Sequence, residues 1–311
     1  MRYRFEFRPY RRWFKQPLQT SHGNWDVREG IILRLTDETG RTSWGEIAPL
    51  SWFGSETLEQ ALDFCSQLPD EITAETIFSI PASLPACQFG FESALEGAAP
   101  LLSPLTYSGL LPTGEAALHQ WHALWNQGYR TFKWKIGVAA IQEELKIFHE
   151  LIQALPAQAQ VRLDANGGLS FSEACEWLRV CDRVGIEFLE QPLPVGEESA
   201  MLELSTQYST QLALDESVAT LERLQATYQQ GWRGVFAIKA AIAGSPSRLR
   251  QFCREHEIDA VFSSVFETVI GRQAALQLAA ELSRHNRAVG FGISHWFDED
   301  DETWLDLWKD L

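Results

Sequence analysis

Four charged residues recur in this sequence at almost constant intervals, each at the end of a short apolar run. They are Asp164, Glu190, Asp215 and Lys239, and the steps 164 to 190, 190 to 215 and 215 to 239 are 26, 25 and 24 residues. One strand–helix unit of a closed β/α barrel has about this length, since roughly 250 residues are shared among eight units. The spacing predicts that each charged residue ends its own strand and that all four face one mouth of a barrel.

The sequence between these residues supports an α/β fold. From residue 105 onward, strand-like runs alternate with amphipathic helical segments such as 139–155, a pattern typical of parallel sheet. Eight strands and seven helices favour a (β/α)7β barrel, a modified TIM barrel, over an open doubly wound sheet, and no GxGxxG motif follows the early strands. The expected strands are 106–111, 131–136, 161–164, 188–190, 212–215, 235–239, 260–263 and 288–291.

Residues 1–104 follow a different pattern and predict an α+β capping domain. An alternating strand at 3–8, a hairpin around 37–40 and helices at 56–67 and 86–98 are expected. The stretches 20–25 and 49–54 are interpreted as loops that could act as lids. The barrel is expected over 105–295, and the acidic segment 296–311, with Trp304 and Trp308, is expected to pack back on the capping domain and complete it.

Charge and composition limit the class of partner. A formal net charge of -16 argues against binding to nucleic acid or to an anionic membrane surface. We find no apolar run of about 18 residues and no signal peptide at the start of the sequence. Five cysteines without a CxxC pair indicate reduced thiols and a cytoplasmic protein. The expected partner is a small-molecule carboxylate, and the oligomeric state is left open.

The three carboxylates predict a metal site. Converging carboxylates raise one another's pKa unless a cation lies between them. Oxygen ligands from aspartate and glutamate favour a hard ion, so Asp164, Glu190 and Asp215 are expected to hold Mg²⁺, with Mn²⁺ as a substitute.

Three lysines flank these carboxylates. Lys133 and Lys135 share one face of a strand, and Lys239 lies four strands away across the mouth. This arrangement suits removal of a proton next to a carboxylate, because a divalent ion stabilises the charge that develops there. A lysine held among other cations can act as the base.

The motifs around these residues resemble those of the enolase superfamily, in its muconate-lactonizing subgroup. The resemblance covers nearly the whole chain and rests on KWK at 133–135, RLDANGG at 162–168, FLEQPL at 188–193, ALDES at 213–217 and AIK at 237–239. Within that subgroup, GEIAPL at 45–50, SSVFET at 263–268 and GFGIS at 290–294 are most similar to the o-succinylbenzoate synthases.

The resemblance implies a Mg²⁺-dependent syn dehydration of 2-succinyl-6-hydroxy-2,4-cyclohexadiene-1-carboxylate to o-succinylbenzoate, a step of menaquinone or phylloquinone synthesis. Lys135 matches the base of the family, Lys239 would stabilise the intermediate from the other side of the ring, and Lys133 would help to keep Lys135 deprotonated.

Further residues are candidates for supporting or binding roles. Asn166, Gln191 and Glu216 are adjacent to the metal ligands, although a surface or helix-start role is equally compatible with the sequence. The second substrate carboxylate would meet hydroxyls and backbone amides, and the substrate ring would be covered by aromatic side chains that could equally be domain-interface core. These substrate-binding candidates are Ser263, Ser264, Gly290, Gly292, Trp25, Trp52 and Phe53.

Other functions stay open at this point. An N-acylamino acid racemase or a dipeptide epimerase would use Lys135 and Lys239 as opposed acid and base. Dipeptide epimerases resemble one another in an Asp-x-Asp motif at the end of the eighth strand, where this chain has Gly290, Phe291 and Gly292. A cycloisomerase and a non-catalytic binding barrel are the remaining alternatives.

Overall fold

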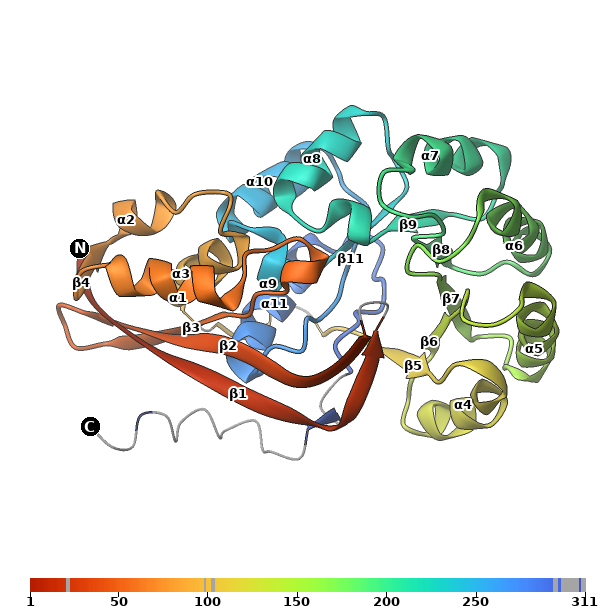
Figure 1. Cartoon of the computed structure of the whole chain (residues 1–311), viewed down its shortest axis with the longest axis horizontal. Coiled ribbons are helices and arrows are strands. Elements are labelled where there is room, and N and C mark those ends of the chain that lie inside the picture. Colours follow the sequence, from red (N-terminus) through yellow and green to blue (C-terminus); the bar gives the residue numbers. More distant parts are fainter. Residues whose placement is uncertain (21–22, 98, 102–103, 293–295, 298–307, 309–311) are drawn as a thin grey trace.

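In the computed structural model, an antiparallel sheet with its helices packs against a barrel of parallel strands (Figure 1). The structure describes the whole chain except residues 21–22, 98, 102–103, 293–295, 298–307 and 309–311. None of the helices within those described ranges is long and apolar enough to cross a membrane.

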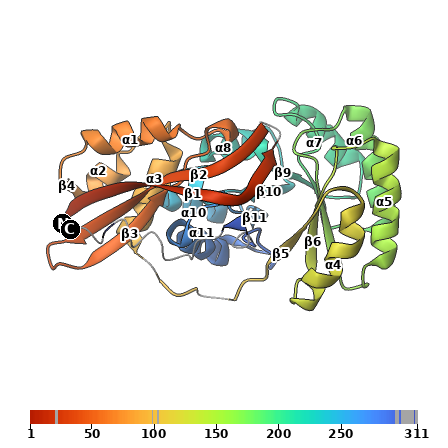
Figure 2. The same ribbon diagram turned by 60° about the horizontal axis from the view of Figure 1, so that its bottom comes forward.

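The N-terminal unit is a four-stranded sheet in the order β3-β2-β1-β4, with helices on one face (Figure 2). Alternate residues of the strands, among them Phe5, Leu33 and Leu35, are buried in the core that the helices share. The hairpin expected around 37–40 is confirmed, since β2 and β3 pair on either side of it. The elements of this unit are β1 (Arg2–Thr20), β2 (Gly23–Asp37), β3 (Thr42–Ile47), η1 (Ser51–Phe53), α1 (Leu58–Gln67), β4 (Glu71–Thr73), α2 (Ala74–Phe78) and α3 (Pro85–Glu96).

The prediction of a loose loop over 20–25 is wrong for the described residues. Strands β1 and β2 continue almost to the tip of their hairpin, where Gln19 pairs with Asn24 and Thr20 with Gly23. Backbone pairing between the two strands holds residues 18–20 and 23–25 extended, although this part of the sequence lacks an apolar alternation. The prediction of a loop over 49–54 agrees with the structure except for the short η1 turn inside it.

The barrel consists of seven parallel strands in sequential order, β5 to β11, with helices outside them (Figure 1). Its strands are β5 (Ser108–Leu111), β6 (Thr131–Lys135), β7 (Gln160–Asp164), β8 (Phe188–Glu190), β9 (Leu212–Leu214), β10 (Val235–Ile238) and β11 (Ala260–Phe262). Its helices are η2 (Gly114–Ala116), α4 (Ala117–Asn126), α5 (Ile141–Ala154), α6 (Phe171–Val184), α7 (Glu198–Gln207), η3 (Glu216–Val218), α8 (Leu221–Gln229), α9 (Ala240–Ala243), α10 (Pro246–Glu255) and α11 (Val269–Leu282).

The expected eighth strand is reduced to two bridging residues. Val289 bridges to Tyr107 ahead of β5, and Gly290 bridges to Ser263 behind β11. The Ser108 amide donates to the Val289 carbonyl at 3.0 Å and the Ser264 amide to the Gly290 carbonyl at 3.1 Å. These bonds join the two ends of the curled sheet, so the barrel is confirmed and the open doubly wound sheet is excluded.

The register brings the charged residues to one level. Lys135 is paired with Asp164, and Asp164 with Glu190, while Asp215 and Lys239 directly follow β9 and β10. Parallel strands of a barrel end on the same face, so all of these side chains start from one rim.

Two described residues of the C-terminal segment contact the N-terminal sheet. Phe297 bridges to Phe14, and the Trp308 ring lies 5.2 Å from Trp44 and 4.3 Å from the Arg34 guanidinium. Trp304 lies outside the described residues. The domain boundaries at 104 and 295 stay a prediction.

Candidate active site

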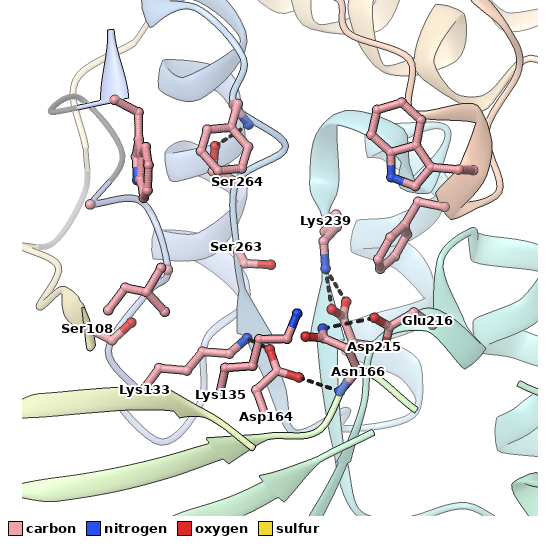
Figure 3. Close-up of a pocket in the computed structure, with 17 residues that line it drawn as sticks. Ser108, Lys133, Lys135, Asp164, Asn166, Asp215, Glu216, Lys239, Ser263 and Ser264 are labelled. Carbon is pink, nitrogen blue, oxygen red and sulfur yellow. Dashed lines mark hydrogen bonds and ion pairs between the residues drawn. The ribbon is translucent and has the colours of Figure 1, made fainter. Parts of the chain in front are cut away.

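A cavity of about 330 Å³ opens at the rim where the barrel strands end, beneath the N-terminal unit. Figure 3 shows lysines, carboxylates and serines from the barrel strands around one space. The structure brings together most of the residues predicted from the sequence. Those that line the cavity are Lys133, Lys135, Asp164, Asn166, Asp215, Glu216, Lys239, Ser263, Ser264, Gly290, Gly292, Trp52 and Phe53.

The three predicted metal ligands lie on adjacent strands and are buried. Asp164 and Glu190 end β7 and β8, and Asp215 follows β9; their relative exposures are 7%, 3% and 2%. Burial raises the pKa of Glu190 to about 7, with Asp164 and Asp215 adding to the effect and Lys133 opposing it. Burial also raises the pKa of Asp215 to about 6, against the influence of Lys239. Burial opposes ionisation of Asp164 as well, but Lys133 holds the pKa of Asp164 below its ordinary value.

Lys133 neutralises two of these carboxylates directly. Its Nζ lies 2.7 Å from Asp164 Oδ2 and 2.7 Å from Glu190 Oε1. Burial alone would lower the pKa of Lys133, but the carboxylates of Asp164, Glu190 and Asp215 raise it above its ordinary value. Lys133 is thus held as a cation beside Lys135, two residues along the same strand.

Lys239 carries the second ion pair of the site. Its ammonium contacts both carboxylate oxygens of Asp215, and the Phe53 ring centroid lies 4.0 Å from Nζ. An aromatic face attracts a cation electrostatically. Lys239 is therefore a charged group fixed between a barrel carboxylate and a ring from the N-terminal unit.

Lys135 differs from the other two lysines because it has no hydrogen-bond or ion-pair partner anywhere in the described part of the chain. Its half-buried side chain extends into the cavity from the end of β6 (Figure 3). Strand order places β6 and β10 four positions apart, so Lys135 and Lys239 approach the cavity from opposite sides.

The three residues beside the carboxylates have separate contacts. The Asn166 amide donates to Asp164 Oδ1 at 3.0 Å, and its side chain donates to Glu216 Oε1 at 3.1 Å. Gln191 is fully buried and does not line the cavity, but its Oε1 accepts from the Asp215 amide at 3.0 Å. Asn166 and Gln191 have φ angles of 43° and 37°, which are uncommon outside glycine. The backbone around the carboxylates is held in a strained form by these bonds.

The predicted serine and glycine wall is only partly free to bind a ligand. The amides of Ser263, Ser264 and Gly290 all donate to backbone carbonyls of neighbouring strands. The Ser264 hydroxyl donates to Glu267 at 2.8 Å. Among the predicted residues of this wall that the structure describes, the half-buried Ser263 hydroxyl and the backbone of Gly292 remain as polar groups for a second carboxylate.

The predicted aromatic residues divide into two groups. Trp52 and Phe53 line the cavity, whereas Trp25 lies behind them with its ring 4.9 Å from that of Trp52. Other lining residues were missed in the sequence: Ser108, Leu110, Phe266 and Trp296. Ser108 and Leu110 belong to the first barrel strand, whose alternation could have singled them out; for Phe266 and Trp296 we find no signal in the sequence.

Comparison with known proteins assigns the family. The family model described as "Enolase C-terminal domain-like" matches residues 116–307, and "MenC, N-terminal domain" matches 13–98. The o-succinylbenzoate synthase of Thermosynechococcus vestitus is 42% identical over 301 residues, covering 94% of this chain and 93% of that protein. The chain belongs to the o-succinylbenzoate synthase family of the enolase superfamily.

A further relative and a solved structure agree with this family assignment. The o-succinylbenzoate synthase of Edwardsiella ictaluri is 31% identical over 269 residues, covering 82% of this chain and 80% of that protein. The crystal structure of the o-succinylbenzoate synthase from Thermosynechococcus elongatus BP-1, complexed with Mg in the active site, superposes with a TM-score of 0.92. Its sequence is 40% identical, and the match covers 99% of this chain and 100% of that one.

The donor groups of this chain suit a hard divalent cation. Within the described ranges, no group of three histidine, cysteine or acidic residues is arranged so that it could hold a metal ion directly. The predicted ligands are paired with Lys133 and Lys239 instead. The donors are nevertheless all carboxylate oxygens on adjacent strands, which Mg²⁺ prefers. A cation among them would oppose the effect of burial, which raises the pKa values of Glu190 and Asp215. That Asp164, Glu190 and Asp215 are the ligands stays a prediction.

Proposed function

We propose that this chain is a magnesium-dependent o-succinylbenzoate synthase, a hydro-lyase of menaquinone synthesis. It would convert 2-succinyl-6-hydroxy-2,4-cyclohexadiene-1-carboxylate into o-succinylbenzoate and water. The observation that carries the proposal is the pair of opposed lysines, Lys135 and Lys239, which line one cavity on either side of the strands that carry the buried carboxylate trio. The 42% identity to an o-succinylbenzoate synthase over 94% of this chain supports the choice of substrate.

In this proposal Lys135 performs both proton transfers. Its unpartnered amine takes the proton from the ring carbon next to the carboxylate, which leaves the C–H electron pair as negative charge shared by that carbon and the carboxylate. This electron pair then forms the ring double bond as the C–O bond breaks. The Lys135 ammonium then returns the proton to the leaving hydroxide, which departs as water. The ring becomes aromatic, so the elimination is downhill and needs no separate acid.

Lys239 and Lys133 act as fixed charges. The Lys239 ammonium faces the ring from the opposite side and stabilises negative charge that develops on it. Lys133 stays cationic between Asp164 and Glu190. Asp164, Glu190 and Asp215 would hold Mg²⁺, with Mn²⁺ as a substitute. The ion would stabilise negative charge on the substrate carboxylate.

A direct assay tests the proposal. Purified protein with Mg²⁺ is incubated with the cyclohexadiene substrate and, separately, with L-dipeptides and N-succinylamino acids, and the ultraviolet change and the loss of optical purity are measured. We expect dehydration with kcat/KM at least about 100-fold above any epimerisation. Faster epimerisation than dehydration would contradict the proposal and favour the racemase alternative.

The variant Lys135→Ala tests the base. We expect kcat to fall by about 10²–10⁴-fold, the usual contribution of a positioned base, with Mg²⁺ binding by calorimetry unchanged. Retained turnover in this variant would remove Lys135 from the mechanism.

A further inference from the structure

A buried carboxylate of the N-terminal unit, that of Glu46 in β3, is bonded to the barrel segment that follows the cavity wall. Glu46 is fully buried, and it belongs to neither the carboxylate trio nor the cavity lining. Its oxygens accept from the Thr268 amide at 2.9 Å, from the Thr268 hydroxyl and from the Gly271 amide at 2.9 Å. Tyr10, also in the N-terminal sheet, donates to it at 2.5 Å. Glu46 therefore caps α11 of the barrel from the other unit.

The residue next to Thr268 continues the chain of bonds to the cavity. Glu267 is buried and accepts from the Ser264 hydroxyl at 2.8 Å and from the Val265 amide at 2.7 Å. The Ser264 hydroxyl in turn accepts from the Phe266 amide at 2.8 Å. Two of the residues held in this way, Ser264 and Phe266, line the cavity.

Phe266 shows why this segment needs support. Its φ is 64°, in the left-handed region that a bulky residue adopts only when its surroundings impose it. Its ring packs edge-on against Phe14 and Trp25 of the β1–β2 hairpin, at 5.3 and 5.5 Å. The strained turn is thus fixed at both ends by the N-terminal unit.

Gly271 shows how closely the carboxylate fits the helix. A Cβ at this position would lie 2.8 Å from Glu46 Oε2 and 3.2 Å from the Glu267 side chain. The first turn of α11 accommodates the Glu46 carboxylate only because residue 271 has no side chain.

We propose that Glu46 is a positioning residue. By holding Thr268 and the start of α11, it fixes the segment 263–268, so the docking of the N-terminal unit sets the shape of the cavity wall formed by Ser263, Ser264 and Phe266. This wall belongs to β11 and the turn after it, whereas Lys135 and the carboxylate trio are carried by the ends of β6 to β9. Loss of the support from Glu46 therefore weakens the binding of the distal part of the substrate and leaves the chemical step intact.

The experiment compares Glu46→Gln with a matched control, Glu92→Gln. Glu92 is a buried residue of α3 that likewise caps a barrel helix, because it accepts from the Ser247 amide at 3.0 Å at the start of α10. Hydrogen exchange of the intact protein is measured at residues 263–271. In Glu46→Gln we expect exchange there to accelerate at least about tenfold, the effect of losing one charge-assisted hydrogen bond, while Glu92→Gln leaves it unchanged.

Kinetics provide the second readout, and this part alone rests on the proposed function. Glu46→Gln is expected to raise KM for the cyclohexadiene substrate about tenfold, with kcat within about threefold and Mg²⁺ affinity unchanged. Thr268→Val should reproduce the effect and Thr268→Ser, which keeps the hydroxyl, should restore normal values. These milder variants keep the test valid if Glu46→Gln folds poorly.

The outcomes are distinguishable. Unchanged exchange at 263–271 in Glu46→Gln and Thr268→Val would overturn the positioning role, as would equal acceleration in Glu92→Gln or a fall in kcat with KM unchanged. If the wild-type protein shows no dehydratase activity and exchange at 263–271 still accelerates in Glu46→Gln, the proposed function is refuted and the positioning role is supported.

Discussion

A cluster of ion pairs lies near the N-terminal ends of the barrel strands, and its loss should lower the free energy of unfolding. Arg162 of β7 donates to Glu187 through Nε at 2.7 Å and Nη2 at 3.1 Å, and Arg287 donates to the same carboxylate at 2.7 Å. The side chains of Arg162 and Glu187 are only 3% and 13% exposed. In Glu187→Gln, the buried Arg162 would retain its bond to the Ala288 carbonyl and lose its counter-charge.

We expect Glu187→Gln to lower the free energy of unfolding by about 3–5 kcal/mol, the usual effect of removing one partner of a buried ion pair. The Arg284–Glu257 pair provides the control, because its side chains are 43% and 74% exposed. Glu257→Gln should leave stability unchanged, since exposed pairs contribute little. Turnover should be normal in both variants, because neither residue lines the cavity.

The difference in the free energy of unfolding between wild type and Glu187→Gln should depend on pH. Burial opposes ionisation of Glu187, but Arg162 and Arg287 hold its pKa below the ordinary value. A depressed pKa gives stability that is present above the unfolded value, about 4.3, and is lost as the pH falls through the folded one. Urea unfolding followed by tryptophan fluorescence should show the full difference between wild type and Glu187→Gln at pH 7 and a smaller one below pH 4. A difference under about 1 kcal/mol at pH 7, or one that does not shrink in acid, would refute this reasoning.

Two further predictions concern the cavity. A chelator should abolish turnover, and added Mg²⁺ or Mn²⁺ should restore it; activity that survives exhaustive chelation would exclude a metal requirement. Phe53→Leu removes the ring that lies 4.0 Å from Lys239 Nζ, so kcat/KM should fall about 2- to 30-fold, corresponding to a cation–π contact of roughly 0.5–2 kcal/mol. Steady-state kinetics beside thermal unfolding would separate this effect from a loss of stability, and an unchanged kcat/KM would show that the contact has no role in turnover.

The position of the charged residues could be predicted because it depends on a short-range rule. Side chains alternate along a strand and parallel strands end on one rim, so equal spacing in the sequence becomes equal height in the barrel. The pairing of Lys135 with Asp164, and of Asp164 with Glu190, follows from that rule. The same rule could not give the length of the β1–β2 hairpin, because residues 18–20 and 23–25 are held by backbone pairing and carry no apolar alternation.

Which polar groups are free to bind a ligand could not be predicted, because that depends on partners distant in the sequence. Ser263 and Ser264 are adjacent and chemically identical, yet the Ser264 hydroxyl is committed to Glu267 and the Ser263 hydroxyl faces the cavity. The commitment of Ser264 depends on a turn whose far end, Thr268, is bonded to Glu46, 222 residues earlier in the chain. Periodicity identifies the side chains that reach the rim, whereas the hydrogen bonds between the two units determine which of these side chains can still hydrogen-bond to a ligand. The shape of the binding wall is therefore a property of the docked pair of units, and neither unit's sequence specifies it alone.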